Sequence, residues 1–300
     1  MRQASWTAVV RDRFWFSVFV LAPFVALIVG ATNAWGFGAD WVALFLCATF
    51  YLIRMGGITI FYHRCFTHRA FVIKRAWLKY AGGIAASMAV QGRVSHWVSQ
   101  HIAHHRDTDG PTDPHSPWRY GHGFWSVCRG AFHAHLGWMF KMGDDDPSLT
   151  KRVMEDPVLA RIDRWFVPCI IAGLLLPPLA GALIRQSFDW MGVDFVWGLV
   201  SLFLVHHAPW SINSVCHLWG TRPLQATGHA TNCWLLALVV LGEGSHCNHH
   251  AFERSAKHGL LGEPDLSWLV IRFLEMLGLV EDVQLPAAEA VGKKRIPPVD

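Results

Sequence analysis

The chain has 300 residues, of which 52% are hydrophobic and only 16% charged, and its mean hydropathy is positive. Soluble domains carry about 25% charged residues on average, so this composition excludes an ordinary soluble enzyme. The formal net charge is only +4 and no nucleic-acid motif is present, which argues against a nucleic-acid-binding protein.

Four apolar segments are long enough to cross a bilayer as helices, which takes about 20 residues each. They are residues 14–35, 41–61, 165–184 and 195–217. The first two are separated by a very short polar gap and are expected to form a helical hairpin. Basic residues precede the first segment, but its apolar run is long and lacks a convincing cleavage site. We therefore interpret it as a retained span rather than a signal peptide.

The Lys and Arg residues predict the orientation of the spans. The gap after the first span contains no Lys or Arg, and the gap between the third and fourth contains only Arg185. The other polar segments are basic, and basic segments stay in the cytosol. Both termini and the segments 62–164 and 218–283 are thus predicted to lie on the cytosolic side.

These two polar segments are expected to form a helical cap over the cytosolic ends of the spans. Segment 266–280 has the pattern of an amphipathic helix, and the apolar segment 76–90 is a candidate for contact with the membrane. The prediction is an all-α integral membrane protein with one domain, residues 1–283, and a loose tail, residues 284–300.

Residue counts then indicate the chemistry. The chain has 16 Trp, a residue enriched at membrane interfaces, and 18 His, which suggests metal binding. A disulfide framework or a thiolate zinc site is not expected, because the Cys residues form no CxxC pair. They are Cys47, Cys65, Cys128, Cys169, Cys216, Cys233 and Cys247.

Three histidine clusters stand out. They are His63 with His68, then His101 with His104 and His105, and His246 with His249 and His250. Positions i, i+3 and i+4 share one face of a helix, so each HxxHH cluster is expected to present three imidazoles toward one point. Two such faces, opposed, can enclose a pair of metal ions.

Two further groups complete the candidate centre. The five-residue step from His63 to His68 does not stay on one face of an α-helix, and we expect a helix end that runs into a turn. Asn213 and His217 lie four residues apart at the cytosolic end of the last predicted span. The other histidines are interpreted as loop or outer groups, among them His115, His122, His133, His135, His206, His207, His229 and His258.

A single HxxHH can be incidental, but two such clusters with an HxxxxH on one predicted side indicate a metal centre. Imidazole suits iron, copper, zinc and nickel. Carboxylates are scarce in these clusters, which distinguishes them from the carboxylate di-metal sites of helical bundles. Neutral imidazole ligands leave the ions electrophilic, as activating O₂ and attacking an unactivated C–H bond require.

At these motifs the sequence resembles the membrane-bound acyl-CoA desaturases of the delta-9 or stearoyl-CoA type, in their bacterial form. The resemblance covers roughly residues 40 to 283. Besides the histidine clusters it is carried by Trp97-Val-Ser-Gln, Asp113-Pro-His-Ser-Pro117, His135-Leu-Gly-Trp-Met-Phe140, Asn213-Ser-Val-Cys-His217-Leu-Trp-Gly220 and Gly242-Glu-Gly-Ser.

The resemblance implies a cytosolic cap over a di-iron site in the bacterial inner membrane. It implies nine direct ligands, with Asn213 touching one ion through water: His63, His68, His101, His104, His105, His217, His246, His249 and His250. The implied reaction is O₂-dependent formation of a cis double bond, at the delta-9 position, in a saturated fatty acyl-CoA or another acyl thioester or lipid. Electrons would come from a separate ferredoxin or a cytochrome b5-like protein with its reductase.

An acyl chain has no handle at the reacting carbon, so a bent apolar tunnel must fix the position. The resemblance places Trp97 and Trp210 near the bend. Cys47 and Tyr51 lie one helical turn apart on the second span and are candidates for the far end. Two alternatives remain open: a related di-iron hydroxylase or acetylenase acting on carrier-protein- or lipid-linked chains, and a metal-binding membrane protein without enzymatic activity.

Overall fold

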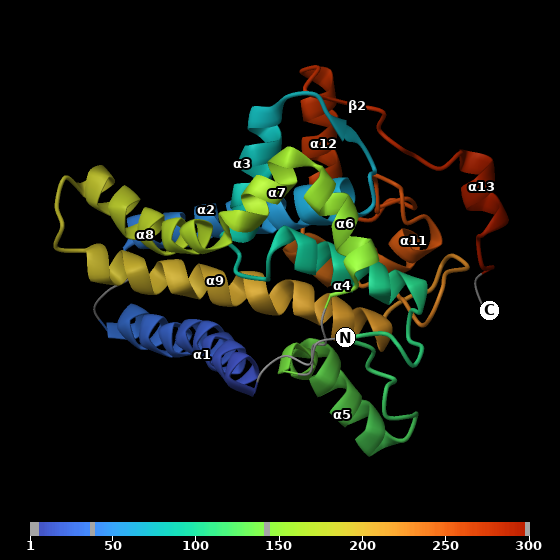
Figure 1. The fold of residues 1–300 in the computed structure, drawn as a ribbon, viewed down its shortest axis with the longest axis horizontal. Coiled ribbons are helices and arrows are strands. Elements are labelled where there is room, and N and C mark those ends of the chain that lie inside the picture. The colour runs from blue at the N-terminus through green and yellow to red at the C-terminus, as the bar shows by residue number, and fades with distance from the viewer. Residues whose placement is uncertain (1–5, 37–39, 141–144, 298–300) are drawn as a thin grey trace.

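The computed structural model describes residues 6–36, 40–140 and 145–297, and within α1 it describes the side chains of residue 14 and of residues 17–32. The described chain is mostly helical (Figure 1). The long helices are α1 (Trp6–Gly36), α2 (Trp41–Gly56) with its continuation η1 (Gly57–Thr67), α8 (Phe166–Arg185), and α9 (Met191–Ser214) with its continuation η3 (Val215–His217). The shorter elements are β1 (Val72–Ile73), α3 (Ala76–Ser87), α4 (Val94–Arg106), α5 (Phe124–His135), η2 (Gly137–Phe140), α6 (Pro147–Glu155), α7 (Pro157–Arg164), α10 (Trp234–Val239), α11 (His246–Ala251), α12 (Leu266–Met276), β2 (Val280–Glu281) and α13 (Ala288–Lys293).

Three helices of the described chain are long and apolar enough to cross a membrane, namely Trp41–Thr67, Phe166–Arg185 and Met191–His217. They correspond to three of the four predicted spans. The first of them is longer than the predicted 41–61, because α2 continues without a break into η1. In α1 the described apolar part, Ser17–Thr32, is shorter than a span requires. The predicted span 14–35 therefore stays a prediction.

Helix α9 is the centre of the long-helix bundle, with α1, α2 and α8 packed around it (Figure 1). A buried arginine of α2 ties this bundle together. Arg54 is 1% exposed and donates to the carbonyl oxygens of Gly173 (2.5 Å) and Gly198 (3.0 Å) and to Ser201 Oγ (2.8 Å). An arginine inside a membrane bundle is costly unless such acceptors satisfy it. These bonds fix α2 against α8 and α9.

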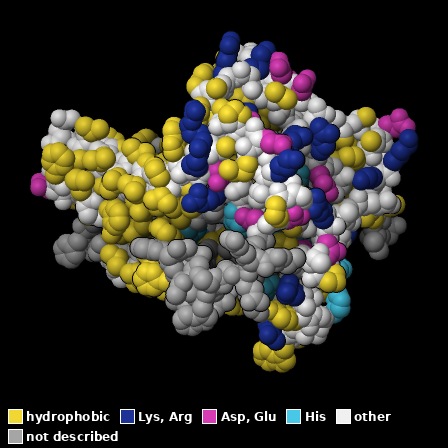
Figure 2. Space-filling model, in the orientation of Figure 1, with side chains coloured by type: hydrophobic (Ala, Val, Ile, Leu, Met, Phe, Trp, Pro, Cys, Tyr) yellow, Lys and Arg dark blue, Asp and Glu magenta, His cyan; other side chains and the backbone are white. Residues whose placement is uncertain are grey.

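The other helices form the cap. In the view of Figure 1, α3 and α12 lie above the long helices and α5 lies below them. Figure 2 shows hydrophobic side chains gathered over α8 and its surroundings, whereas Lys, Arg, Asp and Glu gather over the cap. Strands β1 and β2 pair antiparallel and join the start of the cap to its end, with Val72 opposite Glu281.

The C-terminal segment differs from the expected loose tail. Residues 288–293 form α13, and the segment that follows pairs with the chain before α10. Leu224 and Arg295 form an isolated bridge, and Ile296 N donates to Pro223 O at 2.9 Å. These backbone hydrogen bonds hold residues near the C-terminus against the cap.

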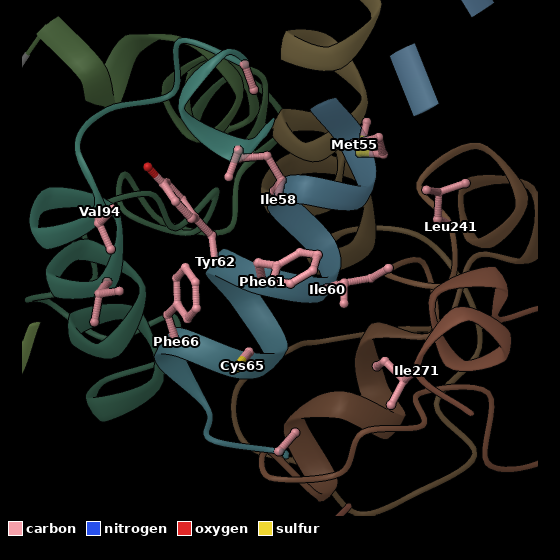
Figure 3. Packing of buried hydrophobic residues seen from close by; sticks show 14 of the residues in the cluster. Met55, Ile58, Ile60, Phe61, Tyr62, Cys65, Phe66, Val94, Leu241 and Ile271 are labelled. Carbon is pink, nitrogen blue, oxygen red and sulfur yellow. The ribbon is translucent and has the colours of Figure 1, made fainter. Parts of the chain in front are cut away.

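Helix η1, the C-terminal part of the long helix Trp41–Thr67, is enclosed by the cap, and all eleven of its residues are buried. In Figure 3 its side chains, among them Phe61 and Phe66, spread around the helix toward Val94, Leu241 and Ile271. The packing against α3 is close because Gly57 has no side chain. A Cβ added there would lie 2.3 Å from the Ala86 nitrogen, nearer than any real contact.

Candidate metal centre

Nine histidines converge in two groups whose nitrogens lie within 4.8 Å of one another. The first group contains five, His63, His68, His101, His105 and His249. The second contains four, His104, His217, His246 and His250. The structure therefore brings together all nine histidines that the sequence singled out as ligands. They come from η1 and the residue after it, from α4, from η3 and from α11. Elements η1 and η3 are the C-terminal ends of the long helices Trp41–Thr67 and Met191–His217.

The two HxxHH clusters do not aim at one point each, as expected from their spacing. In α4 the pair His101 and His105 belongs to the five-histidine group, while His104 belongs to the other. The three histidines of α11 divide in the same way, its i, i+4 pair in the four-histidine group and its i+3 residue in the five-histidine group. Residues i and i+4 are stacked along the helix, whereas i+3 lies to one side. Each HxxHH helix thus supplies two ligands to one group and one to the other.

As expected, His63 lies in a helix and His68 in the turn directly after it, but this helix is not an ordinary α-helix. Helix η1 is a π-helix, in which each N–H bonds to the carbonyl five residues earlier. His68 N donates to His63 O at 3.1 Å in this pattern. The wide helix brings residues i and i+5 to one side, so both rings reach the same group.

The separations within the five-histidine group fit one metal ion. Two nitrogens that each lie about 2.1 Å from an ion at right angles are about 3.0 Å apart. The Nε2 atoms of His63 and His249 are 3.1 Å apart. The pairs His68–His101, His101–His105 and His105–His249 are each separated by 3.0 Å.

The four-histidine group has the same dimensions. The Nε2 atom of His246 lies 3.0 Å from those of His217 and His250, and His104 Nε2 lies 3.3 Å from His250 Nε2. It provides one imidazole fewer than the first group. A bound ion there would have more room for a non-histidine ligand.

Carboxylates hold several of these rings by the far nitrogen, Nδ1. His63 Nδ1 lies 2.5 Å from Glu243 and His104 Nδ1 lies 2.8 Å from Asp113. A ring that donates Nδ1–H in this way presents the Nε2 lone pair to the centre. Facing lone pairs repel unless a cation lies between them, so the packing of these rings fits a bound metal.

His217 is held in the same way, with Nδ1 2.9 Å from Asp109, and His105 Nδ1 lies 3.2 Å from Glu253 without an aligned hydrogen bond. Burial alone would raise the pKa of the Asp109 carboxyl, but the hydrogen bond and charge of His217 lower it to about 2. Burial lowers the pKa of His105 to about 4. The carboxylate is therefore charged and this imidazole neutral at pH 7, the states in which they serve a metal site.

Glu243 connects the centre to the core of the cap. Besides His63 it contacts the guanidinium of Arg64 at 3.1 Å, and Arg64 also pairs with Asp265 at 2.9 Å. Arg64 is fully buried, so these two carboxylates balance a charge that is removed from water. The His258 ring also lies 3.5 Å from Glu243, and the His258 backbone N donates to Asp265 Oδ2 at 2.6 Å.

The supporting carboxylates are the part of the site that sequence reasoning missed. Asp113 and Glu243 stood in the motifs that carried the resemblance, but neither was given a role. The sequence pattern that could have identified them is an acidic residue a few positions from a histidine cluster, as Glu243 is from His246. The interpretation of His115 and His258 as outer groups fits their places beside Asp113 and Glu243.

Two neighbouring cavities that share lining residues reach the histidines from the side of α9. The larger, of about 300 Å³, lies among α1, α4, α8 and α9 and includes Trp97, Trp210 and Asn213 in its wall. The smaller, of about 60 Å³, shares Trp97 and Asn213 with it and touches both histidine groups through His101 and His104. An apolar molecule in the larger cavity would extend toward the centre past Trp97.

Comparison with known proteins identifies the family. A family model described as fatty acid desaturase matches residues 39–260, about three quarters of the chain. The chain belongs to the fatty acid desaturase family. Within this family the chain is 36% identical to the sn-1 stearoyl-lipid 9-desaturase of Synechocystis, over 85% of this chain and 76% of that protein. It is 38% identical to the enzyme of the same name from Anabaena variabilis, over 87% and 92%.

A third relative in the desaturase family has a different named reaction. The chain is 34% identical to the hex-5-enoyl-[acyl-carrier protein] acetylenase of Moorena producens, over 94% of this chain and 89% of that protein. The names of these relatives refer to lipid-linked and carrier-protein-linked chains, and none refers to CoA. The acyl-CoA type expected from the resemblance is therefore narrower than what the comparisons support.

The four residues predicted to line a substrate tunnel lie in two different places. Trp97 and Trp210 line the larger cavity, and their position near a bend stays a prediction. Cys47 and Tyr51 line neither of the two cavities that reach the histidines. The Tyr51 hydroxyl donates to the Val239 carbonyl, and the next residue, Val240, lines the smaller cavity. The roles of Cys47 and Tyr51 stay predictions.

Proposed function

We propose that the protein is an O₂-dependent fatty-acyl desaturase that uses two iron ions and introduces a cis double bond at the delta-9 position. The observation that carries this proposal is the pair of imidazole groups at the inner end of an apolar cavity. The substrate loses two vicinal hydrogens, and a donor supplies two electrons. With two protons from water these reduce O₂ to two molecules of water, so atoms and electrons balance.

The nine histidines would hold the iron, five at one position and four at the other, with Asn213 beside the second through a water molecule. When bound, iron would supply the activation of O₂ and the removal of hydrogen from carbon. The protein itself binds and orients the acyl chain, holds the ligand rings in place and excludes water from the centre. Glu243 and Asp113 hold ligand rings by Nδ1, and the wall formed by Trp97 and Trp210 positions the methylenes next to the centre.

We infer that the acyl chain arrives esterified to a membrane lipid. None of the described residues that line the two cavities is a lysine or arginine. The phosphates of CoA or of a carrier protein's prosthetic group call for such partners. The larger cavity is lined by neutral amide side chains, Gln91 and Gln100, which suit a glycerol ester. The lipid-linked relatives support the same choice.

In the same proposal α1 is a fourth span, and the cap and both termini face the cytosol of a bacterial inner membrane. The chain distribution of Lys and Arg supports this orientation. It places the histidine centre on the side where reduced electron carriers are found.

The test is expression of the full chain in a bacterial host without a desaturase, followed by fatty-acid profiling. We expect a new cis-monounsaturated chain, located at C9 by mass spectrometry of disulfide adducts, that appears first in glycerolipids after a label pulse. Early appearance in the acyl-CoA or acyl-carrier-protein pool would contradict the lipid substrate. His104→Ala should abolish the product, and an unchanged profile would contradict the metal assignment.

One alternative reaction has an observation in its favour, the acetylenase among the relatives. An acetylenase would remove two hydrogens from an existing alkene. Supplying the host with a monounsaturated chain and finding a product two mass units lighter, with no product from saturated chains, would favour it. Two bound metal ions per chain with no product of any kind would favour a metal-binding membrane protein.

A further inference from the structure

A second recess reaches the histidine centre from a different face of α4. It has a volume of about 390 Å³ and lies between the end of η1, α4, α6 and the segment after α11. Its wall contains two ligand histidines, four arginines and one glutamate: His68, His105, Arg69, Arg106, Arg152, Arg254 and Glu253. Both histidines belong to the five-histidine group.

Helix α4 separates this arginine recess from the acyl cavity. Trp97, Gln100 and His101 line the cavity, whereas Ile102 and His105, one helical turn further on, line the recess. His101 and His105 belong to the same histidine group, so the five-histidine group lies between the two spaces. A molecule in the recess would approach this group without displacing the acyl chain.

The positive charge of the recess is largely uncompensated. Arg69, Arg152 and Arg254 form no ion pair with any carboxylate of the described residues, and Arg69 and Arg254 are exposed. Only Arg106 has an acidic partner, Asp146 at 3.4 Å, with the Arg106 side chain 58% exposed. Four guanidinium groups around one opening, three of them without an acidic partner among the described residues, attract an anionic surface.

Arg152 has a structural role within the same wall. It donates to the carbonyl oxygens of Phe66 and Thr67, at 3.0 and 2.8 Å, directly before the ligand His68. Burial and the like charge of Arg69 lower the pKa of Arg152. The wall is therefore built, with its position fixed by η1, and its one acid, Glu253, pairs with His105 rather than with an arginine.

We propose that the arginine recess is the docking site of a small acidic electron-transfer protein, and that His68 and His105 are the point where electrons enter. This proposal rests on the proposed desaturase function, which consumes two electrons per double bond. A docked carrier would be separated from the centre by an imidazole ring. Because substrate and carrier occupy different faces of α4, both can be bound during one turnover.

The binding test needs no turnover. The full chain in lipid nanodiscs is titrated with oxidised plant-type [2Fe–2S] ferredoxin, and in parallel with cytochrome b5, as acidic probes. We expect Arg106→Glu/Arg254→Glu to raise Kd at least about tenfold at low salt and to flatten its dependence on ionic strength. Lys74→Glu, an exposed charge reversal directly after β1, is the control and should leave Kd unchanged. Equal Kd values for the wild type and the double variant would overturn the proposal.

The turnover test separates this proposal from the proposed function. Wild type and double variant are supplied with an acyl-lipid and either reduced ferredoxin or dithionite. We expect the double variant to lose at least about 90% of its ferredoxin-driven rate at sub-saturating ferredoxin and to keep its dithionite-driven single turnover. Arg106→Lys/Arg254→Lys should restore the ferredoxin-driven rate.

Other outcomes have distinct meanings. No product from the wild type with either reductant refutes the function and leaves the binding result to decide the docking site. A double variant that fails only with acyl-carrier-protein substrates, and binds ferredoxin normally, would make the recess a carrier-protein site and overturn the electron-entry proposal.

Discussion

Because each supporting carboxylate contacts a ligand histidine of one group, a substitution there should weaken the binding of one metal ion and not of the other. Asp113 is fully buried; its Oδ2 accepts from His104 Nδ1 and from Asp109 N, each at 2.8 Å, and its Oδ1 accepts from His115 N at 3.0 Å. An asparagine has only one acceptor oxygen, so Asp113→Asn loses the charge and leaves a buried donor unsatisfied. Loss of such a partner typically costs 10- to 100-fold in metal affinity, or about 1.4–2.7 kcal/mol.

The loss should be confined to the four-histidine group, because His104 belongs to that group alone. The assay dialyses iron-loaded protein against graded chelator and counts iron per chain by mass spectrometry. We expect the wild type to lose both iron ions over the same range of chelator concentration. Asp113→Asn should lose half of its iron at a chelator concentration about 10- to 100-fold lower. Glu243→Gln, which acts on His63, should weaken the other ion.

Two variants decide whether this reasoning holds. Asp189→Asn, in an exposed turn between α8 and α9, should retain iron like the wild type. If Asp113→Asn releases both ions together, or neither, while remaining folded, the carboxylate does not act through a single ligand and the division into two groups is refuted.

Three further outcomes follow from packing, from the site and from the tunnel. Gly57→Ala should lower the free energy of unfolding by about 1–3 kcal/mol in a detergent thermal melt, because its Cβ would meet the Ala86 backbone; Gly192→Ala, where no atom lies within 4 Å, should not. Removing metal with a chelator should lower Tm, and adding iron back should restore it, since the ion binds only the folded chain; an unchanged Tm would argue against a metal centre. Tyr51→Ala should shift product profiles toward longer chains, and an unchanged preference would exclude Tyr51 from the tunnel's end.

The sequence was most informative where ligands repeat along one helix. The HxxHH spacing in α4 and α11 depends only on local helical geometry, so these six histidines could be predicted. Their division between two groups could not, since it depends on how α4 and α11 face each other. The same holds for Asp113, whose contact with His104 is set by the turn after α4.

Of the four spans predicted from hydropathy, three correspond to long apolar helices of the described chain, but hydropathy did not predict where the second span ends. Apolar composition indicates where a helix can cross a bilayer, and η1 extends it with buried polar residues such as His63 and Arg64. A window of apolar residues ends before them. Their burial follows from ion pairs and ring contacts with α11 and its neighbours, which no local pattern contains.

The π-helical form of η1 makes the length of this segment as important as its residues. In an α-helix each residue adds about 100° of rotation, so two residues five positions apart would lie about 140° apart around the axis. The wider turn of the π-helix removes this offset for His63 and His68, and one additional residue between them would turn one ring away from the other. Point substitutions that preserve the form of η1 would keep both rings on one side. An insertion between the two histidines should therefore be tolerated far less than a replacement.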